Sequence, residues 1–198
     1  MPTKIGEVVK GFYNTTPFPD YELDRFNSKE DLRISSSEFA KVLDRSIPKD
    51  ASVIDVGTGT GQLAAFLSLR RKHVLGIDFS DASLSKATAL KQKLNLNSLH
   101  IRRVDISDIK QIENIKTRFD YMLCLGVLHH TEDAYQSFKN ILKLLKPNGY
   151  IAIGLYNKFG RIPLKIRRFL VKTIFKNNKR MKEQFIKINI GDIEDKER

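Results

Sequence analysis

The fold of this chain is decided by Val53-Ile54-Asp55-Val56-Gly57-Thr58-Gly59-Thr60-Gly61. A β-branched apolar run ends there in an acidic residue, and glycines follow at every second position. Residues 62–67 then have the pattern of a helix start. Strand, glycine turn and helix in this order are typical of an open α/β sheet that brings its backbone close to an adenosine-containing ligand. Glycine permits positive φ and leaves no Cβ to block that approach.

The spacing of the glycines narrows the class of ligand. The dinucleotide fingerprint G-x-G-x-x-G fails because Gln62 stands at its last position, and a Walker A loop would need Gly-Lys-Ser/Thr at its end. What remains is D-x-G-x-G-x-G, with Asp55 inside the strand end. Through this motif the chain resembles the class I S-adenosylmethionine-dependent methyltransferases, whose first motif is E/D-x-G-x-G-x-G. The resemblance covers about residues 35–157.

Length and composition restrict the broad class. A chain of 198 residues predicts one domain with a real core. No apolar stretch reaches the roughly 18–20 residues that span a bilayer, and the first residues lack the apolar run of a signal peptide. A single cysteine, Cys124, excludes an intrachain disulfide framework and a cysteine-only metal cluster. We therefore expect a cytoplasmic location.

The positive charge is concentrated near the end of the chain. The net charge is +12, and residues 156–198 carry thirteen Lys and Arg against five acidic residues. A basic segment of this kind attracts phosphates in nucleic acid, nucleotide-linked substrates or lipid head groups. A solvated helix face with surplus lysine accounts for it equally well, so both interpretations stay open.

Strands and helices are expected to alternate along the chain, which predicts a doubly wound, mostly parallel sheet. The expected strands are 52–56, 73–78, 99–104, 119–125 and 150–155. The expected helices begin at a capping box at 35–38, at Gln62, after the cap Ser80 and at Asp133, and Pro147-Asn148-Gly149 stops the last of them at Lys146.

The last part of the chain fits the family pattern less well. Class I methyltransferases usually complete the sheet with an antiparallel pair of strands. After residue 155 only 43 residues remain, of which 162–175 resemble a basic amphipathic helix and 184–190 could form one strand. The predicted Rossmann-like methyltransferase sheet is therefore apparently short of its last hairpin, through natural shortening or because the sequence stops early. We divide the chain into an N-terminal arm or lid at 1–34, a core at 35–157 and a basic segment at 158–198.

Three carboxylates are expected where predicted strands end. Ligands of a doubly wound sheet lie across the C-terminal ends of the strands, and Asp55, Asp78 and Asp105 each stand at such an end. One acid of this kind is more often a helix cap or a turn residue. Three in register with a glycine loop favour an extended, adenosine-bearing ligand.

The resemblance assigns a role to each of these residues, with S-adenosylmethionine as the cofactor. It implies that Asp78 binds the ribose hydroxyls, that Phe79 packs on adenine and that Asp105, beside Ile106, binds the adenine amino group. It also implies that Asp55 and the backbone of Gly126 hold the methionine end. The cofactor-binding set is then Asp55, Gly57, Thr58, Gly59, Gly61, Asp78, Phe79, Asp105, Ile106 and Gly126.

The only candidate catalytic side chains are two histidines after the fourth strand. Gly126-Val127-Leu128-His129-His130 resembles the G-V-L-H-H segment of the family at the same place. A histidine there could act as general base, because its pKa lies near neutrality; alternatively, His129 and His130 only shape the pocket. Metal binding is not expected, since no further Cys or His lies nearby.

The resemblance predicts an enzyme that transfers a methyl group to a small-molecule or metabolite acceptor. The aromatic, proline-rich stretch 12–19 could cover the cofactor as a lid or be a packed arm. Tyr156-Asn157-Lys158 lacks the N/D-P-P-Y/F/W motif, which argues against a DNA N-methyltransferase. Alternatives are an RNA methyltransferase that uses the basic segment 161–180 and a catalytically silent cofactor-binding subunit. An open sheet edge could support a homo-oligomer.

Overall fold

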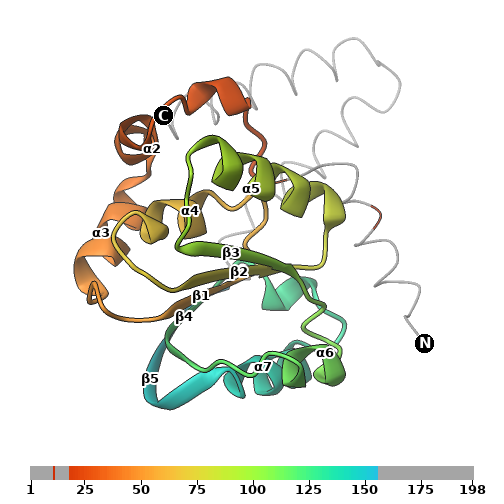
Figure 1. Ribbon diagram of the computed structural model, residues 1–198. Helices are drawn as coiled ribbons and strands as arrows, with labels where there is room; N and C mark the ends of the chain where they lie inside the picture. The colour runs from red at the N-terminus through yellow and green to blue at the C-terminus, as the bar shows by residue number, and fades with distance from the viewer. Residues whose placement is uncertain (1–10, 12–17, 156–198) are drawn as a thin grey trace, which may run out of the picture. The chain divides into compact units, whose positions relative to one another are not determined.

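The computed structural model describes residue 11 and residues 18–155. The chain divides into one unit that ends at Leu155 and another that starts at Tyr156, of which only the first is described. The described sheet has five parallel strands in the order β3-β2-β1-β4-β5 (Figure 1). Their bounds are β1 Val53–Val56, β2 Val74–Asp78, β3 Leu99–Arg103, β4 Phe119–Leu125 and β5 Leu145–Gly154.

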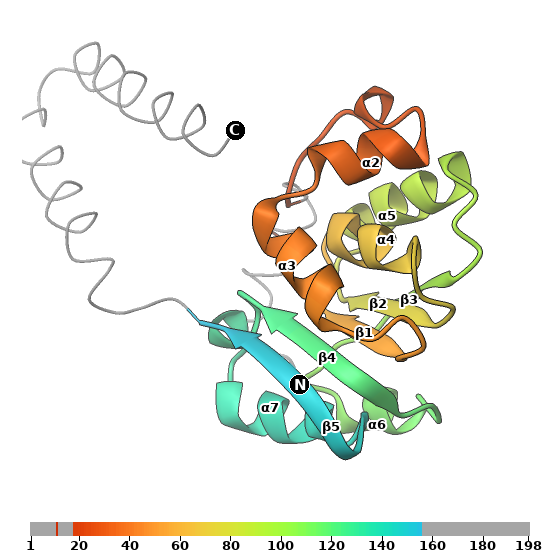
Figure 2. The same cartoon turned by 90° about the vertical axis from the view of Figure 1, so that its left-hand side faces the viewer.

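Helices cover both faces of this sheet. In both views α3, α4 and α5 lie on one side, and α6 and α7 lie on the other (Figures 1 and 2). The predicted doubly wound, Rossmann-like α/β fold is confirmed. The helices are α2 Lys29–Ser35, α3 Glu38–Ser46, α4 Gln62–Ser68, α5 Asp81–Lys93, α6 Ile109–Glu113 and α7 Ala134–Leu142, with 3-10 turns η1 Leu23–Arg25 and η2 Leu128–His130.

The central strand β1 faces two hydrophobic cores. Its four residues are all buried, because successive side chains of a strand point to opposite faces and both faces are covered. Val53 packs into the core under α4 and α5, and Ile54 packs into the core above α6 and α7. A strand covered on both faces reads as a continuous apolar run, which is why Asp55 stands out within it.

Helix α2, which lies before the core, was not predicted from the sequence. The capping box lies at Ser28, whose hydroxyl accepts from the N–H of Asp31 at 3.0 Å while the Asp31 carboxylate accepts from the N–H of Ser28 at 2.9 Å. This box begins α2, so the prediction of a box at 35–38 is wrong. Ser35 ends α2, and Ser37 is the N-cap of α3. Aspartate in the fourth position replaces the glutamate of the usual pattern.

The boundary between the last helix and the last strand also differs from the prediction. Helix α7 ends at Leu142, and β5 begins at Leu145 and runs through Pro147-Asn148-Gly149. A proline fits in an edge strand, where its missing N–H needs no partner. The register of the β4–β5 pair shifts near its start: Phe119 pairs with Leu145, whereas Tyr121 pairs with Tyr150. The turn residues 147–149 lie in the extra length of β5 between these two pairs. The short helix α6 was also not predicted.

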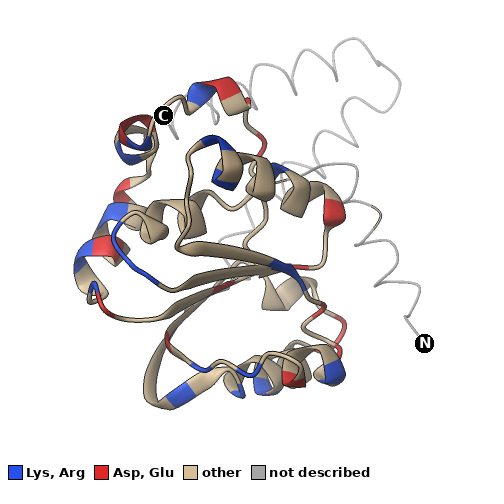
Figure 3. Ribbon diagram, in the orientation of Figure 1, with Lys and Arg blue, Asp and Glu red and all other residues tan. Residues whose placement is uncertain are grey.

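The remaining sequence predictions about the end of the chain lie outside the described residues. These are the amphipathic helix at 162–175, the strand at 184–190 and the absence of the final hairpin. None of the helices in the described ranges is long and apolar enough to cross a membrane. Figure 3 shows Lys and Arg interspersed with Asp and Glu on α2, α3 and α6.

Candidate functional site

The glycine loop adopts a left-handed backbone at each of its three glycines. The φ angles are +71° at Gly57, +55° at Gly59 and +80° at Gly61, a region that side chains strongly disfavour. Close packing by the protein adds to this requirement. A Cβ on Gly57 would lie 2.2 Å from Cγ2 of Val127, and one on Gly59 would lie 2.2 Å from the carbonyl oxygen of Phe18. These two glycines are therefore required by the protein's own packing.

The backbone N–H groups of the loop all have acceptors within the protein. The donor–acceptor distances are Gly57 to Ile77 O 2.8 Å, Thr58 to Ile77 O 2.9 Å, Gly59 to Asp78 Oδ2 2.9 Å, Thr60 to Phe18 O 3.3 Å and Gly61 to Thr58 O 2.9 Å. Phosphate-binding loops work because their N–H groups point at the anion. In this loop those donors are already used, so it does not form a phosphate cradle.

Asp78 joins the end of β2 to the glycine loop. Its Oδ1 accepts from the N–H of Ser80 at 2.9 Å, and its Oδ2 accepts from the N–H of Gly59 at 2.9 Å. Burial raises the pKa of this carboxyl, although these hydrogen bonds favour the charged form and act against the rise. Phe79 lies half-buried in the same turn. The hydroxyl of Ser80 accepts from the N–H of Ser83 and caps α5 as predicted.

Asp55 lies beneath the loop and is almost completely buried. Its carboxylate accepts a hydrogen bond from the Thr58 hydroxyl at 2.7 Å. Burial raises the pKa of Asp55 to about 6, and the nearby charge of Asp78 raises it further, against the Thr58 bond. Two carboxylates at one end of the sheet favour a cation. Burial, assisted by Asp55, also raises the pKa of the Cys124 thiol to about 12, which keeps it protonated at neutral pH.

Asp105 and Ile106 follow the C-terminal end of β3, next to the C-terminal end of β2. The N–H of Val104 donates to the carbonyl of Asp78 at 2.8 Å, which holds the ends of β3 and β2 together. Asp105 is exposed, and its Oδ1 accepts from the N–H of Ser107 at 2.9 Å. The Ile106 side chain packs into the core above α6 and α7. Of the two, Asp105 presents its side chain at the surface.

The segment after β4 meets the loop through Val127. Gly126 has φ +75°, and its N–H donates to the carbonyl of Gly154 at 2.9 Å. Val127 fills the space above Gly57. His129 and His130 follow in η2, half-buried, with ring centroids 4.1 Å apart and ring planes at 50°. The structure therefore places both histidines just after the C-terminal end of β4, on the side of the sheet where the strands that carry the acids also end, and their role as a base stays a prediction.

The N-terminal arm contacts the glycine loop through Pro19, which belongs to the predicted stretch 12–19, and through Tyr21, which the sequence analysis did not single out. The Tyr21 hydroxyl donates to the carbonyl of Thr60 at 2.8 Å, and the Thr60 hydroxyl donates to the carbonyl of Pro19 at 2.7 Å. Burial raises the pKa of Tyr21 to about 12. No local pattern could have predicted these contacts, because the partners lie about forty positions apart in the sequence. Residues 12–17 of the predicted lid lie outside the described residues.

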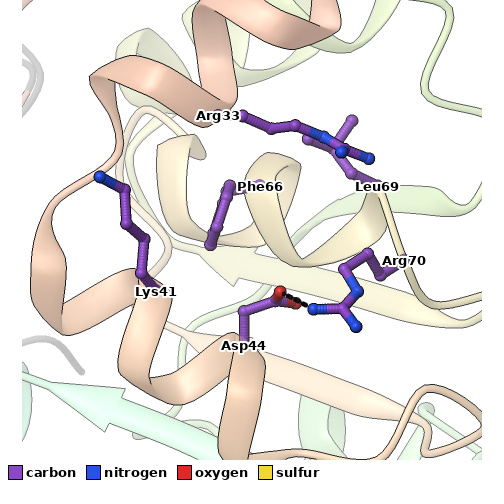
Figure 4. A pocket seen from close by; sticks show the side chains of 6 residues that line it. All are labelled: Arg33, Lys41, Asp44, Phe66, Leu69 and Arg70. Carbon is purple, nitrogen blue, oxygen red and sulfur yellow. Dashed lines mark hydrogen bonds and ion pairs between the residues drawn. The ribbon is translucent and has the colours of Figure 1, made fainter.

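A hollow of about 300 Å³ lies elsewhere, between α2, α3 and α4 (Figure 4). It is lined by Arg33, Lys41, Asp44, Phe66, Leu69 and Arg70. Helix α4 starts at the glycine loop and Arg70 follows its far end, so this hollow is not part of the loop site. Its polar wall is an ion pair of 2.6 Å between Arg70 and Asp44, and the buried Arg71 donates to the same carboxylate at 2.6 Å.

Comparisons with known proteins agree with this arrangement. The sequence profile of a family described as "Methyltransferase domain" matches residues 47–197. Ubiquinone biosynthesis O-methyltransferase from Rickettsia bellii is 29% identical over 109 residues, which is 55% of this chain and 43% of that protein. The chain thus spans less than half of the length of this curated relative.

Solved structures show the same fold at low identity. Magnesium protoporphyrin IX methyltransferase from Synechocystis, with bound SAH, superposes with a TM-score of 0.62 at 18% identity, over 83% of this chain and 78% of that one. The cyclase SpnF superposes with a TM-score of 0.52 at 20% identity, over 59% of this chain and 43% of that one. The fold therefore occurs with more than one named activity. Because the family profile covers most of the sequence, the chain belongs to the methyltransferase domain family.

Proposed function

We propose that this protein is an S-adenosylmethionine-dependent methyltransferase that acts on a small-molecule acceptor. One observation carries the proposal: all five N–H groups of loop 57–61 are bonded within the protein, beside two carboxyl groups, the buried Asp55 and the half-buried Asp78, whose pKa values burial raises. Such a site is poor in donors for a phosphate and attractive to a cation. S-adenosylmethionine carries a sulfonium and an ammonium group, whereas a nucleotide would bring phosphates.

The residues present fit this cofactor. A carboxylate offers about four acceptor positions. Asp78 uses two of them for the N–H groups of Ser80 and Gly59 and forms a further backbone hydrogen bond with Phe79. What is left of its acceptor capacity can accept from a ribose hydroxyl. The Thr58 hydroxyl holds the Asp55 carboxylate beneath the loop. There its negative charge would attract the positively charged methionine end of the cofactor. Phe79, Asp105, Ile106 and Gly126 complete the proposed site, with Asp105 as the exposed acid at its adenine end.

The cofactor, when bound, supplies a methyl group that its sulfonium already activates. The chain then has to align the acceptor and exclude water, effects that can account for roughly 7–11 kcal/mol of a barrier. His129 or His130 would take the proton of an acceptor hydroxyl during transfer, since an imidazole titrates near neutrality.

The proposed acceptor class rests on the relatives. The named acceptor of the Synechocystis protein is a small molecule, and the Rickettsia relative is named for ubiquinone biosynthesis. An RNA acceptor would depend on the basic segment 161–180, which lies outside the described residues. A cytoplasmic location and a homo-oligomer stay predictions of the sequence.

Calorimetry with S-adenosylmethionine and S-adenosylhomocysteine tests the cofactor. We expect micromolar binding of both by the wild type and at least tenfold weaker binding by Asp78→Ala, because two or more charge-assisted hydrogen bonds are lost. Asp50→Ala, which removes an exposed acid before β1, should bind as the wild type does. Equal affinity of Asp78→Ala and wild type would contradict the site.

Transfer of a labelled methyl group tests the reaction and the acceptor class. We expect label in a panel of phenolic and carboxylic small molecules and none in total RNA. Label in RNA that disappears at high salt would instead support the nucleic-acid acceptor, because phosphate contacts weaken steeply with salt. Cofactor binding without transfer to any acceptor would support a silent subunit.

A further inference from the structure

Thr60 connects the glycine loop to the segment Phe18–Tyr21, which we call the strap. All three polar groups of Thr60 bond to the strap. Its N–H donates to the carbonyl of Phe18 at 3.3 Å, its hydroxyl donates to the carbonyl of Pro19 at 2.7 Å, and its carbonyl accepts from the Tyr21 hydroxyl at 2.8 Å. Thr60 itself is 0% exposed. Each polar group of this residue therefore has a partner in the strap, and none is exposed to solvent.

The strap is also held by contacts outside the loop. Tyr21 is buried, and its ring meets Phe26 edge to face with centroids 5.2 Å apart. Asp20 forms an ion pair with Lys86 of α5. The strap is thus anchored to the core and to α5 as well as to Thr60, so its position and that of the loop depend on each other.

The strap also explains the middle glycine of the loop. The carbonyl of Phe18 occupies the position that a side chain at residue 59 would take. On its other side, the N–H of Gly59 bonds to Asp78, the proposed ribose ligand. Gly59 therefore lies between the strap and the proposed cofactor residue, and a displaced strap would free the loop to move away from Asp78.

We propose that the strap is a coupling element of the cofactor site and that Thr60 is the positioning residue through which it acts. The docked strap holds the loop in its ligand-binding conformation, so strap docking and cofactor binding stabilise one another. The inference rests on the proposed function, because it takes the loop as the cofactor site. Coupling of this kind is reciprocal: the factor by which the strap raises ligand affinity equals the factor by which ligand favours the docked strap.

The test compares Thr60→Val with Thr60→Ser, using S-adenosylhomocysteine as the probe. Valine removes the hydroxyl that bonds to Pro19, and serine keeps it. We expect Thr60→Val to weaken binding about 3- to 10-fold, as the loss of one neutral hydrogen bond predicts, and Thr60→Ser to stay within about twofold. Tyr21→Phe removes the bond to the Thr60 carbonyl and should act in the same direction, and it carries the test if the valine variant does not fold.

Hydrogen exchange separates coupling from a merely structural role. In the wild type, S-adenosylhomocysteine should slow exchange in peptides that contain the strap and the Thr60 amide. In Thr60→Val the ligand should still protect β2 and Asp78 but protect the strap less. Lys93→Met is the control. It removes a hydrogen bond of 2.8 Å from Lys93 to the carbonyl of Leu23, in the turn η1 that follows the strap, and should leave ligand affinity unchanged.

The outcomes distinguish the two proposals. If the wild type binds S-adenosylhomocysteine and Thr60→Val loosens the strap without weakening binding, the coupling is overturned and the cofactor site stands. If Thr60→Val lowers the melting temperature but affinity and ligand-dependent exchange match the wild type, Thr60 is only structural. If the folded wild type does not bind the probe, the proposed function fails and the coupling fails with it.

Discussion

The backbone N–H of Gly59 and Oδ2 of Asp78 are 2.9 Å apart, so the middle glycine of the loop and the acid at the end of β2 are directly hydrogen bonded. Asp78→Asn keeps the size of this side chain but replaces one acceptor oxygen by an NH₂ donor. Whichever way the amide turns, it loses the bond to Gly59 or to Ser80. We expect a loss of about 1–3 kcal/mol in unfolding free energy and at least tenfold weaker S-adenosylhomocysteine binding. Urea unfolding and calorimetry measure the two, and a fully stable, fully binding variant would contradict the role of Asp78.

Asp55→Asn should make the unliganded protein more stable and the site weaker. The pKa of Asp55 is raised to about 6 in the fold, so its contribution to stability is greatest when protonated and is lost as pH rises from about 4 through 6. Over this pH range the unfolding free energy of the wild type falls by about 3 kcal/mol because of Asp55. Asparagine keeps an acceptor for Thr58 and carries no charge. We expect the variant to exceed the wild type in unfolding free energy at pH 8 and to match it near pH 4.

The control for that comparison is ligand binding at the same two pH values. The variant should bind S-adenosylhomocysteine more weakly at pH 8 in spite of its higher stability. An Asp55→Asn protein that is less stable than the wild type at both pH values would show that the carboxylate is paired more strongly than its surroundings indicate.

Asp44→Ala should unfold much of the protein without touching the proposed site. The Arg71 side chain is fully buried, and it donates to the Asp44 carboxylate at 2.6 Å and to the carbonyls of Asp44 and Ile47 at 2.8 and 2.6 Å. Burial alone would raise the pKa of Asp44, but the hydrogen bonds from Arg71 and Arg70 hold it below its usual value. Without the carboxylate, Arg71 is a buried charge with no counterion, which costs about 3–5 kcal/mol.

Arg70→Ala is the matched control, because Arg70 pairs with the same carboxylate from an exposed position. It should cost no more than about 1 kcal/mol. Thermal unfolding of both variants measures the difference, and a similar cost for the two would show that burial of Arg71 is not what makes this cluster important.

Gly57→Ala should be destabilising for two separable reasons. Its φ of +71° costs a non-glycine residue roughly 1–2 kcal/mol, and its Cβ would clash with Val127 at 2.2 Å. Adding Val127→Ala to the variant should recover the second cost and leave the first. Urea unfolding of the two single variants and the double variant gives the interaction energy. Strict additivity would mean that the two residues do not meet as described.

The strand–helix alternation and the cap at Ser80 could be predicted because each rests on neighbours in the sequence. Strand β4 was predicted with its observed bounds, since it is apolar and covered on both faces. Pro147-Asn148-Gly149 misled because these turn residues do not end the helix but lie inside β5, in the irregular stretch between the pairs Leu145–Phe119 and Tyr150–Tyr121. The contacts of Thr60 with Pro19 and Tyr21 were not predictable, because no local pattern records them.

The strand order has a consequence for the chain while it is being synthesised. The first residue of β1, Val53, pairs with Tyr121 of β4, which lies 68 positions later in the sequence. At about 5–20 residues per second, β1 waits roughly 3–14 s for that neighbour to leave the ribosome. During this interval one side of the most buried strand has no partner. We therefore expect nascent chains arrested between Val56 and Leu125 to bind a general chaperone more strongly than chains that extend past Leu125.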